Sequence, residues 1–220
     1  MATRPARPFL GSAVPGKEGH IGEGTVFVVD DEEPMRNALR RLLSSSGFSV
    51  HTFSNADSFL ESHHRDGPSC VLLDLHMPGM NGLQLQEELQ VRGISIPIIF
   101  LTGAGSVAQA VSAMHAGAVD FLEKPFSNDA LVERVRKALQ ADREALERDF
   151  RHRLVKEKVA TLTPREKEVL VLLSKGQSNK VIARALDISP RTVEGYRARL
   201  MEKLEAKSVA ELVRIVEQAQ

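Results

Sequence analysis

Three carboxylates and one lysine stand at places in this 220-residue sequence where a charged side chain needs a partner. Asp30 and Asp31 follow the apolar run TVFVV, and Asp74 ends the apolar run CVLL. A carboxylate at the end of a buried segment is costly unless something binds it. Lys124 follows a further apolar run, in FLEKPF, and carries the opposite charge. These four residues are the candidates for chemistry.

The candidates form one site if the apolar runs are parallel strands. In a doubly wound sheet, ligands bind beyond the carboxyl ends of the strands, where the strand order switches. Because neighbouring strands lie about 5 Å apart, Asp30, Asp31 and Asp74 are expected to crowd together there. Like charges that close resist ionisation unless a cation neutralises them. Oxygen ligands in an open, hydrated site suit Mg²⁺, which we therefore predict at these acids.

Two further strand ends add groups that suit phosphoryl transfer. Thr102, in FLTG, offers a hydroxyl, and Lys124 offers an ammonium. Together with a carboxylate and Mg²⁺ they fit a reaction whose catalysis is mostly positioning and charge neutralisation. Asp74 is then the nucleophile that forms an aspartyl phosphate. A lone strand-end Asp is usually a cap or loop residue, but this ordered set rarely arises by chance.

Strands and helices alternate through the first half of the sequence. We predict strands at 25–30, 49–53, 70–74, 97–101 and 118–122, separated by helices from Pro34 to Gly47 and at 56–63, 83–91 and 107–116. A last helix is capped by Asn128 or Asp129. This alternation implies a parallel sheet covered on both faces. The predicted fold is a flavodoxin-like, doubly wound (βα)5 domain with strand order 2-1-3-4-5.

The rest of the chain is predicted to be helical. No Gly or Pro interrupts residues 126–163, so we expect a long connecting helix to about Lys158. Its apolar seam is sparse, which favours a solvated spacer over a coiled coil. The predicted units are a disordered tail over 1–23, an α/β domain over 24–140, a linker helix over 141–160 and a four-helix domain over 161–220.

The last domain carries the pattern of a helix-turn-helix. Thr163 is the predicted cap of its first helix, with Pro164 in the first turn and Glu166 completing a capping box. A second helix begins at Ser178, and a tight turn leads to a third helix capped by Ser189. Two short helices and a tight turn before a basic helix are typical of a DNA-binding motif.

One face of the third helix is predicted to enter the major groove of DNA. Glu194 suits acceptance from a cytosine amino group, and Arg191 suits donation to guanine or phosphate. The small residues Gly195 and Ala198 lie on the same outward face. The predicted contacts to phosphate are Lys180, Thr192, Arg197 and Arg199. The alternative is a solvated amphipathic helix, because residues 160–220 hold eleven Lys and Arg against eight Asp and Glu.

The composition of the chain limits which functions and locations are possible. No run of about 18 apolar residues exists, so no membrane span is expected. Residues 24–125 hold six Lys and Arg against twelve Asp and Glu, which suits a cationic ligand there. Cys70 is the single cysteine, which excludes an internal disulfide and fits a reducing compartment such as the cytoplasm.

Residues 24–140 resemble the receiver domain of two-component response regulators, in VVDDE, LLDLHMPGMNG, FLTG and FLEKPF. The resemblance implies Asp74 as phosphoacceptor and Asp30 and Asp31 as the acidic pair. It implies Mg²⁺ bound by Asp31, Asp74 and the main-chain carbonyl of His76. It also implies that Thr102 and Lys124 hold the phosphoryl oxygens, that Phe121 is the switch aromatic, and that the bond before Pro125 is cis.

Residues 161–220 resemble the LuxR-type helix-turn-helix, in TPREKEVL, SNKVIA and ISPRTVEGYRARLMEKL. The order of the domains is that of the FixJ/NarL family, closest to its FixJ branch. Tyr196 and Gly195 depart from that family's pattern. The resemblance implies a histidine kinase partner, a homodimer when phosphorylated, a roughly palindromic operator, activated transcription, and RNA polymerase as a further candidate partner.

Two other functions stay open from the sequence. The first is a phosphatase with an aspartate nucleophile, but such enzymes use an acid two residues after it, where this chain has His76. The second is a DNA-binding protein whose receiver domain is never phosphorylated. We expect a regulator rather than an enzyme.

Overall fold

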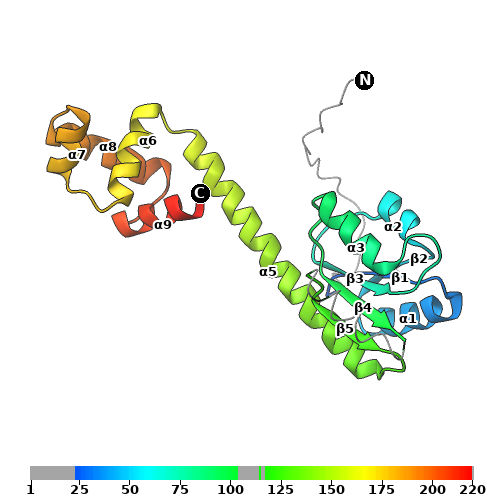
Figure 1. Cartoon of the computed structure of the whole chain (residues 1–220). Helices are drawn as coiled ribbons and strands as arrows, with labels where there is room; N and C mark the ends of the chain where they lie inside the picture. The colour runs from blue at the N-terminus through cyan, green and yellow to red at the C-terminus, as the bar shows by residue number, and fades with distance from the viewer. Residues whose placement is uncertain (1–22, 104–113, 115–116, 220) are drawn as a thin grey trace, which may run out of the picture.

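The computed structural model describes residues 23–103, 114 and 117–219, which fold into an α/β domain and a helical domain (Figure 1). The α/β domain contains strands β1 Thr25–Val29, β2 Ser49–Phe53, β3 Ser69–Asp74, β4 Ile98–Thr102 and β5 Asp120–Glu123. Its helices are α1 Glu33–Ser45, α2 Ala56–Ser62, α3 Gly82–Val91 and the first part of α5 Asn128–Ala160. The predicted helix over 107–116, except residue 114, and nearly all of the predicted tail lie outside the described residues.

The strands form a parallel sheet in the predicted order β2-β1-β3-β4-β5. The bounds of the last two strands differ from the prediction. Thr102 belongs to β4, because its carbonyl accepts a hydrogen bond of 2.7 Å from the Lys124 main-chain N–H. β5 begins at Asp120, two residues later than predicted.

Alternate residues of each strand enter two separate cores, as the two-residue period of a strand requires. Phe27 of β1 packs in a core with α2 and α3, where Phe59 and Leu89 are fully buried or nearly so. Val28, the next residue of β1, packs on the other face with α1 and α5. Helices therefore cover both faces of the sheet, which confirms the doubly wound architecture (Figure 1).

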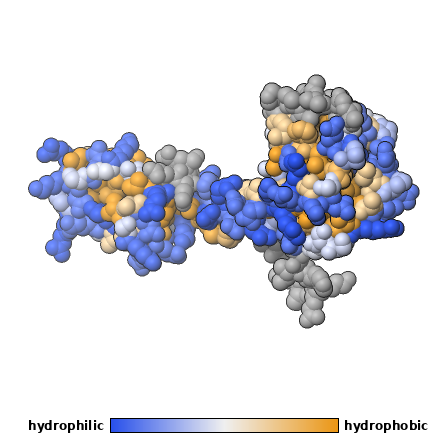
Figure 2. Space-filling model, turned by 90° about the horizontal axis from the view of Figure 1, so that it is seen from below, coloured by the Kyte–Doolittle hydropathy of each residue, from blue (hydrophilic) through white to orange (hydrophobic). Residues whose placement is uncertain are grey.

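α5 is one continuous helix of 33 residues that links the two domains (Figure 1). Its cap is Ser127, whose side chain accepts from the Ala130 N–H, and not Asn128 or Asp129 as predicted. Midway along the helix, Phe150 and Leu154 are exposed, and the connecting segment presents a mostly hydrophilic surface in Figure 2. These features favour the solvated spacer.

A buried ion pair fixes α5 to the sheet beyond the predicted domain boundary at residue 140. Asp142 is only 4% exposed, and both its oxygens accept from the Arg65 guanidinium, at 2.8 and 2.6 Å. One of these oxygens also accepts from the main-chain N–H of Ser69, at the start of β3 (2.8 Å). The Asp142 carboxylate therefore packs within the α/β domain, two residues beyond the boundary predicted at residue 140.

The helical domain contains α6 Pro164–Ser174, α7 Asn179–Leu186, α8 Pro190–Lys203 and α9 Val209–Ala219, as predicted. Its core includes Leu173 from α6, Ile182 from α7, Leu200 from α8 and Leu212 from α9. Among the described helices, none has the length and apolar character that a membrane span requires.

We predict that Asp142→Ala lowers the stability of the α/β domain by about 2 kcal/mol, because it leaves a partly buried guanidinium and a buried N–H without their acceptor. Urea unfolding followed by circular dichroism measures the change. The matched control is Ser69→Ala, which keeps the main-chain N–H and removes a buried hydroxyl that has no partner. Equal stability of Asp142→Ala and the wild type would contradict this assignment.

Candidate functional site

Two buried carboxylates share one ammonium at the carboxyl end of the sheet. The Lys124 Nζ lies 2.7 Å from Oδ1 of Asp74 and 3.2 Å from Oδ2 of Asp30. Asp30 is fully buried after β1, and Asp74 is 8% exposed at the end of β3. Because β1 and β3 are neighbours, two acids 44 positions apart in sequence meet beside a lysine that follows β5.

The second oxygen of each carboxylate accepts a hydrogen bond from the main chain. Oδ1 of Asp30 accepts from the Glu32 N–H (2.8 Å), and Oδ2 of Asp74 accepts from the His76 N–H (2.7 Å). Burial of the Lys124 ammonium acts to lower its pKa, but the hydrogen bonds and charges of Asp74 and Asp30 outweigh it and raise the pKa. Lys124 is therefore a fixed positive charge at neutral pH.

The expected cluster of three acids is only partly formed. Asp31 is exposed, and in the described part of the chain no group of three or more His, Cys, Asp or Glu side chains is placed to hold a metal. His76 is also exposed, which leaves its main chain beside Asp74. The oxygen-only donors still suit a hard cation, because the single ammonium of Lys124 offsets only one of the two buried negative charges.

Thr102 and the start of α3 complete the surroundings of Asp74. Thr102 is 2% exposed at the end of β4. The Gly82 N–H donates to the Leu75 carbonyl (3.1 Å), so that α3 begins against the main chain that follows Asp74. A Cβ on Gly82 would lie 2.5 Å from the Asp74 carbonyl oxygen and 3.1 Å from Leu75 Cα. Only glycine fits this approach without moving the backbone that carries Asp74.

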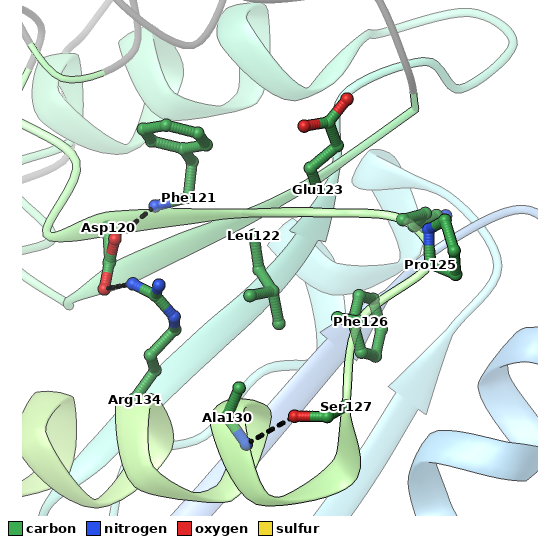
Figure 3. A pocket seen from close by; sticks show the side chains of 10 residues that line it. Asp120, Phe121, Leu122, Glu123, Pro125, Phe126, Ser127, Ala130 and Arg134 are labelled. Atoms are coloured by element: carbon green, nitrogen blue, oxygen red, sulfur yellow. Dashed lines mark hydrogen bonds and ion pairs between the residues drawn. The ribbon is translucent and has the colours of Figure 1, made fainter.

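The predicted switch residue Phe121 lies on β5, two strands beyond the strand that carries Asp74. Figure 3 shows Phe121 and Glu123 on one side of β5 and Leu122 on the other, facing α5. Phe121 is 39% exposed. Beside it, Asp120 accepts from Arg134 of α5, and a hollow of about 560 Å³ follows the strand to Lys124 and Pro125. The Lys124–Pro125 bond is cis, as the resemblance implied.

In the helical domain, a buried glutamate ties the first helix to the third. Glu166 is 2% exposed and accepts from the Thr163 N–H (2.9 Å), which confirms the capping box. It also accepts from Lys203 of α8 (2.8 Å). The Lys203 ammonium, and then the Thr163 N–H, lower the pKa of Glu166 to about 2, although burial opposes this.

The residues predicted to contact DNA fall into two groups. Most are exposed on α7 and α8: Lys180, Arg191, Thr192, Glu194, Ala198 and Arg199. Gly195 is half-buried at the middle of α8. Arg197 is also half-buried, and its guanidinium donates to Oδ1 of Asn179 (2.7 Å) at the start of α7. Arg197 therefore links the two helices of the motif, whereas the sequence suggested only a phosphate contact.

Each domain contains a side-chain contact between distant residues that the sequence did not predict. Arg65 and Asp142 are 77 positions apart, and a lone charged residue in a loop or on a polar helix is usually solvated. Lys203 and Glu166 are 37 positions apart. The capping-box pattern predicted the role of Glu166 but could not show that a lysine of another helix also binds it.

Comparisons with known proteins agree with both resemblances. Residues 26–136 match the family described as response regulator receiver domain, and residues 160–216 match the bacterial regulatory proteins of the luxR family. The transcriptional regulatory protein FixJ of Bradyrhizobium diazoefficiens is 42% identical over 90% of this chain and 96% of its own length. The transcriptional regulatory protein TdiR of Thauera aromatica is 41% identical over 87% of this chain and 85% of its own. The solved structure of the response regulator StyR, 42% identical, superposes with a TM-score of 0.79 and covers 89% of this chain and 98% of StyR.

We predict that Gly82→Ala destabilises the α/β domain and reduces phosphoryl uptake from acetyl phosphate, because the added methyl displaces the main chain at Asp74. Thermal unfolding and intact mass measure the two effects. Gly67→Ala is the matched control, since no atom lies within 4 Å of its Cβ and its φ is not positive. A Gly82→Ala protein with wild-type stability and uptake would contradict the proposed fit.

The lowered pKa of Glu166 makes the helical domain sensitive to acid. Its carboxylate stabilises the domain fully above about pH 4.5, and this contribution is lost as the pH falls toward about 2. Fluorescence of Tyr196, the single tyrosine in a chain without tryptophan, reports on this domain alone. We expect Glu166→Gln to be less stable at pH 7 and to lose less stability across that window.

The control for this titration is Glu168→Gln, on the same helix, where Glu168 forms a half-exposed ion pair with Arg165. This variant should follow the wild-type pH curve. If Glu166→Gln follows it as well, the Lys203 contact does not lower the pKa.

Proposed function

The chain belongs to the FixJ/NarL family of two-component response regulators, and we propose that it is switched by a phosphoryl group carried on Asp74. It is a DNA-binding transcriptional regulator with a receiver domain and a LuxR-type domain. One observation carries the assignment of Asp74: its carboxylate is held beside Asp30 by Lys124 at 2.7 Å, at the open end of the sheet.

Each polar group near Asp74 has a proposed role. A histidine kinase is the proposed donor, and an Asp74 oxygen attacks the phosphorus as the kinase histidine leaves. Lys124 and the hydroxyl of Thr102 hold the oxygens of the transferred group. Asp30, Asp31, Asp74 and the main-chain carbonyl of His76 would hold Mg²⁺, which neutralises phosphoryl charge when it is bound. The positive charge of Lys124 offsets part of the negative charge of these acids before any metal binds.

The phosphoryl group is proposed to act by shifting an existing equilibrium. Thr102 ends β4 and pairs with Glu123 of the neighbouring strand β5, which also carries Phe121, so a change at Thr102 can pass to the exposed face of β5. That face, with the helix predicted over 107–116, would pair two receivers. Pairing brings two DNA-binding domains to the half-sites of a roughly palindromic operator in the cytoplasm, where they activate transcription, with RNA polymerase as a further partner.

We propose no enzymatic activity on a separate substrate. His76 stands where an aspartate-dependent phosphatase has its general acid, and in this structure His76 is exposed. The regulatory reading needs only a stable acceptor, which the main-chain and lysine contacts of Asp74 provide.

Intact mass after incubation with acetyl phosphate and Mg²⁺ tests the acceptor. We expect one added phosphoryl group on the wild type, none on Asp74→Asn, and none on the wild type with excess EDTA. Asp57→Asn changes an exposed acid of α2 and is the matched control, which should accept the group normally. Uptake by Asp74→Asn would overturn the assigned site.

The switch itself is tested on the same samples. Sedimentation velocity should show a shift from monomer to dimer on phosphorylation, and affinity for operator DNA should rise about tenfold or more. An unchanged sedimentation coefficient together with unchanged DNA affinity in a fully phosphorylated sample would contradict control by dimerisation.

A further inference from the structure

Gly195 lies at the centre of the outward face of α8. The buried residues of this helix, Val193, Leu200 and Leu204, lie on the opposite side. Glycine inside a helix is unfavourable relative to alanine, because its backbone loses more conformational freedom on folding. A helix-interior glycine on an outward face therefore needs a reason.

The protein itself supplies no such reason. The φ angle of Gly195 is not among the positive values that favour glycine. A Cβ built on Gly195 meets only the guanidinium of Arg199, at 3.8 Å, which is an ordinary van der Waals distance. An alanine would fit the free protein and would favour the helix. In contrast, Gly82 is a glycine that packing does require, with a Cβ contact of 2.5 Å.

The side chain of Arg199 lies beside Gly195, where α8 carries no side chain. The Arg199 Nε donates to the Gly195 carbonyl at 3.4 Å, and its guanidinium carbon lies 5.0 Å from the ring centre of Tyr196. Within the described chain, Arg199 forms no ion pair. Its guanidinium thus lies over an aromatic ring, and within the described residues its terminal N–H groups donate to no other group.

We propose that Gly195, Tyr196 and Arg199 form a base-reading unit that sets the DNA sequence preference of this regulator. The missing side chain at position 195 lets the middle of α8 approach the base edges closely. Tyr196 holds the guanidinium flat at that point, so that two parallel N–H groups meet the O6 and N7 acceptors of a guanine in the major groove. Arg199 then specifies sequence, in place of the phosphate contact first expected.

This unit rests on the proposed entry of α8 into the major groove. Stacking restricts the arginine before binding, which reduces the entropy lost when it meets a base. A methyl group at position 195 is harmless in free protein but occupies the space of closest approach. The structure therefore assigns opposite effects to one substitution, namely higher stability and altered recognition.

The experiment selects bound sequences from randomised duplexes with full-length, phosphorylated protein. We expect Gly195→Ala to raise the melting temperature of the Tyr196-reported transition by about 4 °C and to weaken binding to the wild-type consensus about tenfold or more. Ala141→Gly, an exchange in the opposite direction on exposed α5, should leave the consensus unchanged. A Gly195→Ala protein with wild-type consensus and affinity would overturn the proposal.

Arg199→Lys separates base reading from phosphate contact. Lysine keeps the positive charge but lacks the planar fork, so we expect it to lose preference for one guanine per half-site while the salt dependence of binding stays unchanged. Wild-type preference in Arg199→Lys, with a uniform loss and a smaller salt slope in Arg199→Ala, would show a phosphate contact and overturn the proposal. If the wild-type protein itself selects no sequence, the proposed entry of α8 into the major groove is wrong. This outcome differs from both results expected for the Arg199 variants.

Discussion

Two negative charges buried at one end of a sheet constrain the whole α/β domain. Burying the carboxylates of Asp30 and Asp74 at that depth is costly without a cation and donated N–H groups. Lys124 supplies the cation. It follows β5, two strands beyond β3, and its ammonium reaches both carboxylates. The carboxyl ends of parallel strands share one edge of the sheet, and the observed order places β1 and β3 side by side there, so that one ammonium reaches both acids. A phosphoryl group on Asp74 would add negative charge beside the Lys124 ammonium. The proposed switch follows from the new ion pairs that Lys124 would then form.

The sequence predicted where these side chains lie, because strand ends in a parallel sheet are set by simple rules. Alternation of strands and helices predicted the strand order, and the order placed Asp30, Asp74, Thr102 and Lys124 at one edge. The exposure of Asp31 was not predictable, because Asp30, one residue beyond β1, is still buried while Asp31, two residues beyond it, is exposed, and only the backbone path decides where the chain turns away from the sheet. The cap of α5 is Ser127 rather than a neighbour, since several residues in a row could serve and only the backbone path decides among them.

Contacts between distant segments were the main features that the sequence did not reveal. Arg65 and Asp142 look like ordinary solvated charges, yet together they hold α5 against the start of β3. This pair matters for communication, because α5 packs on the sheet at one end and on α9 at the other, and runs between them without a break. A long helix held firmly at both ends transmits rotation better than a loop would, and the buried Asp142 fixes its phase relative to the sheet.

The low net charge of the helical domain is compatible with DNA binding once the positions of its charges are considered. Several acids are neutralised in ion pairs within the protein: Glu166 binds Lys203, Glu168 binds Arg165 and Glu205 binds Lys158. These pairs lie on α5, α6 and the end of α8, away from the middle of α8. In contrast, Lys180, Arg191 and Arg199 are exposed on α7 and α8 and form no ion pair within the described residues. Free positive charge is thus concentrated on the two helices of the motif, and it is this local excess, rather than the sum over the domain, that attracts a phosphate backbone.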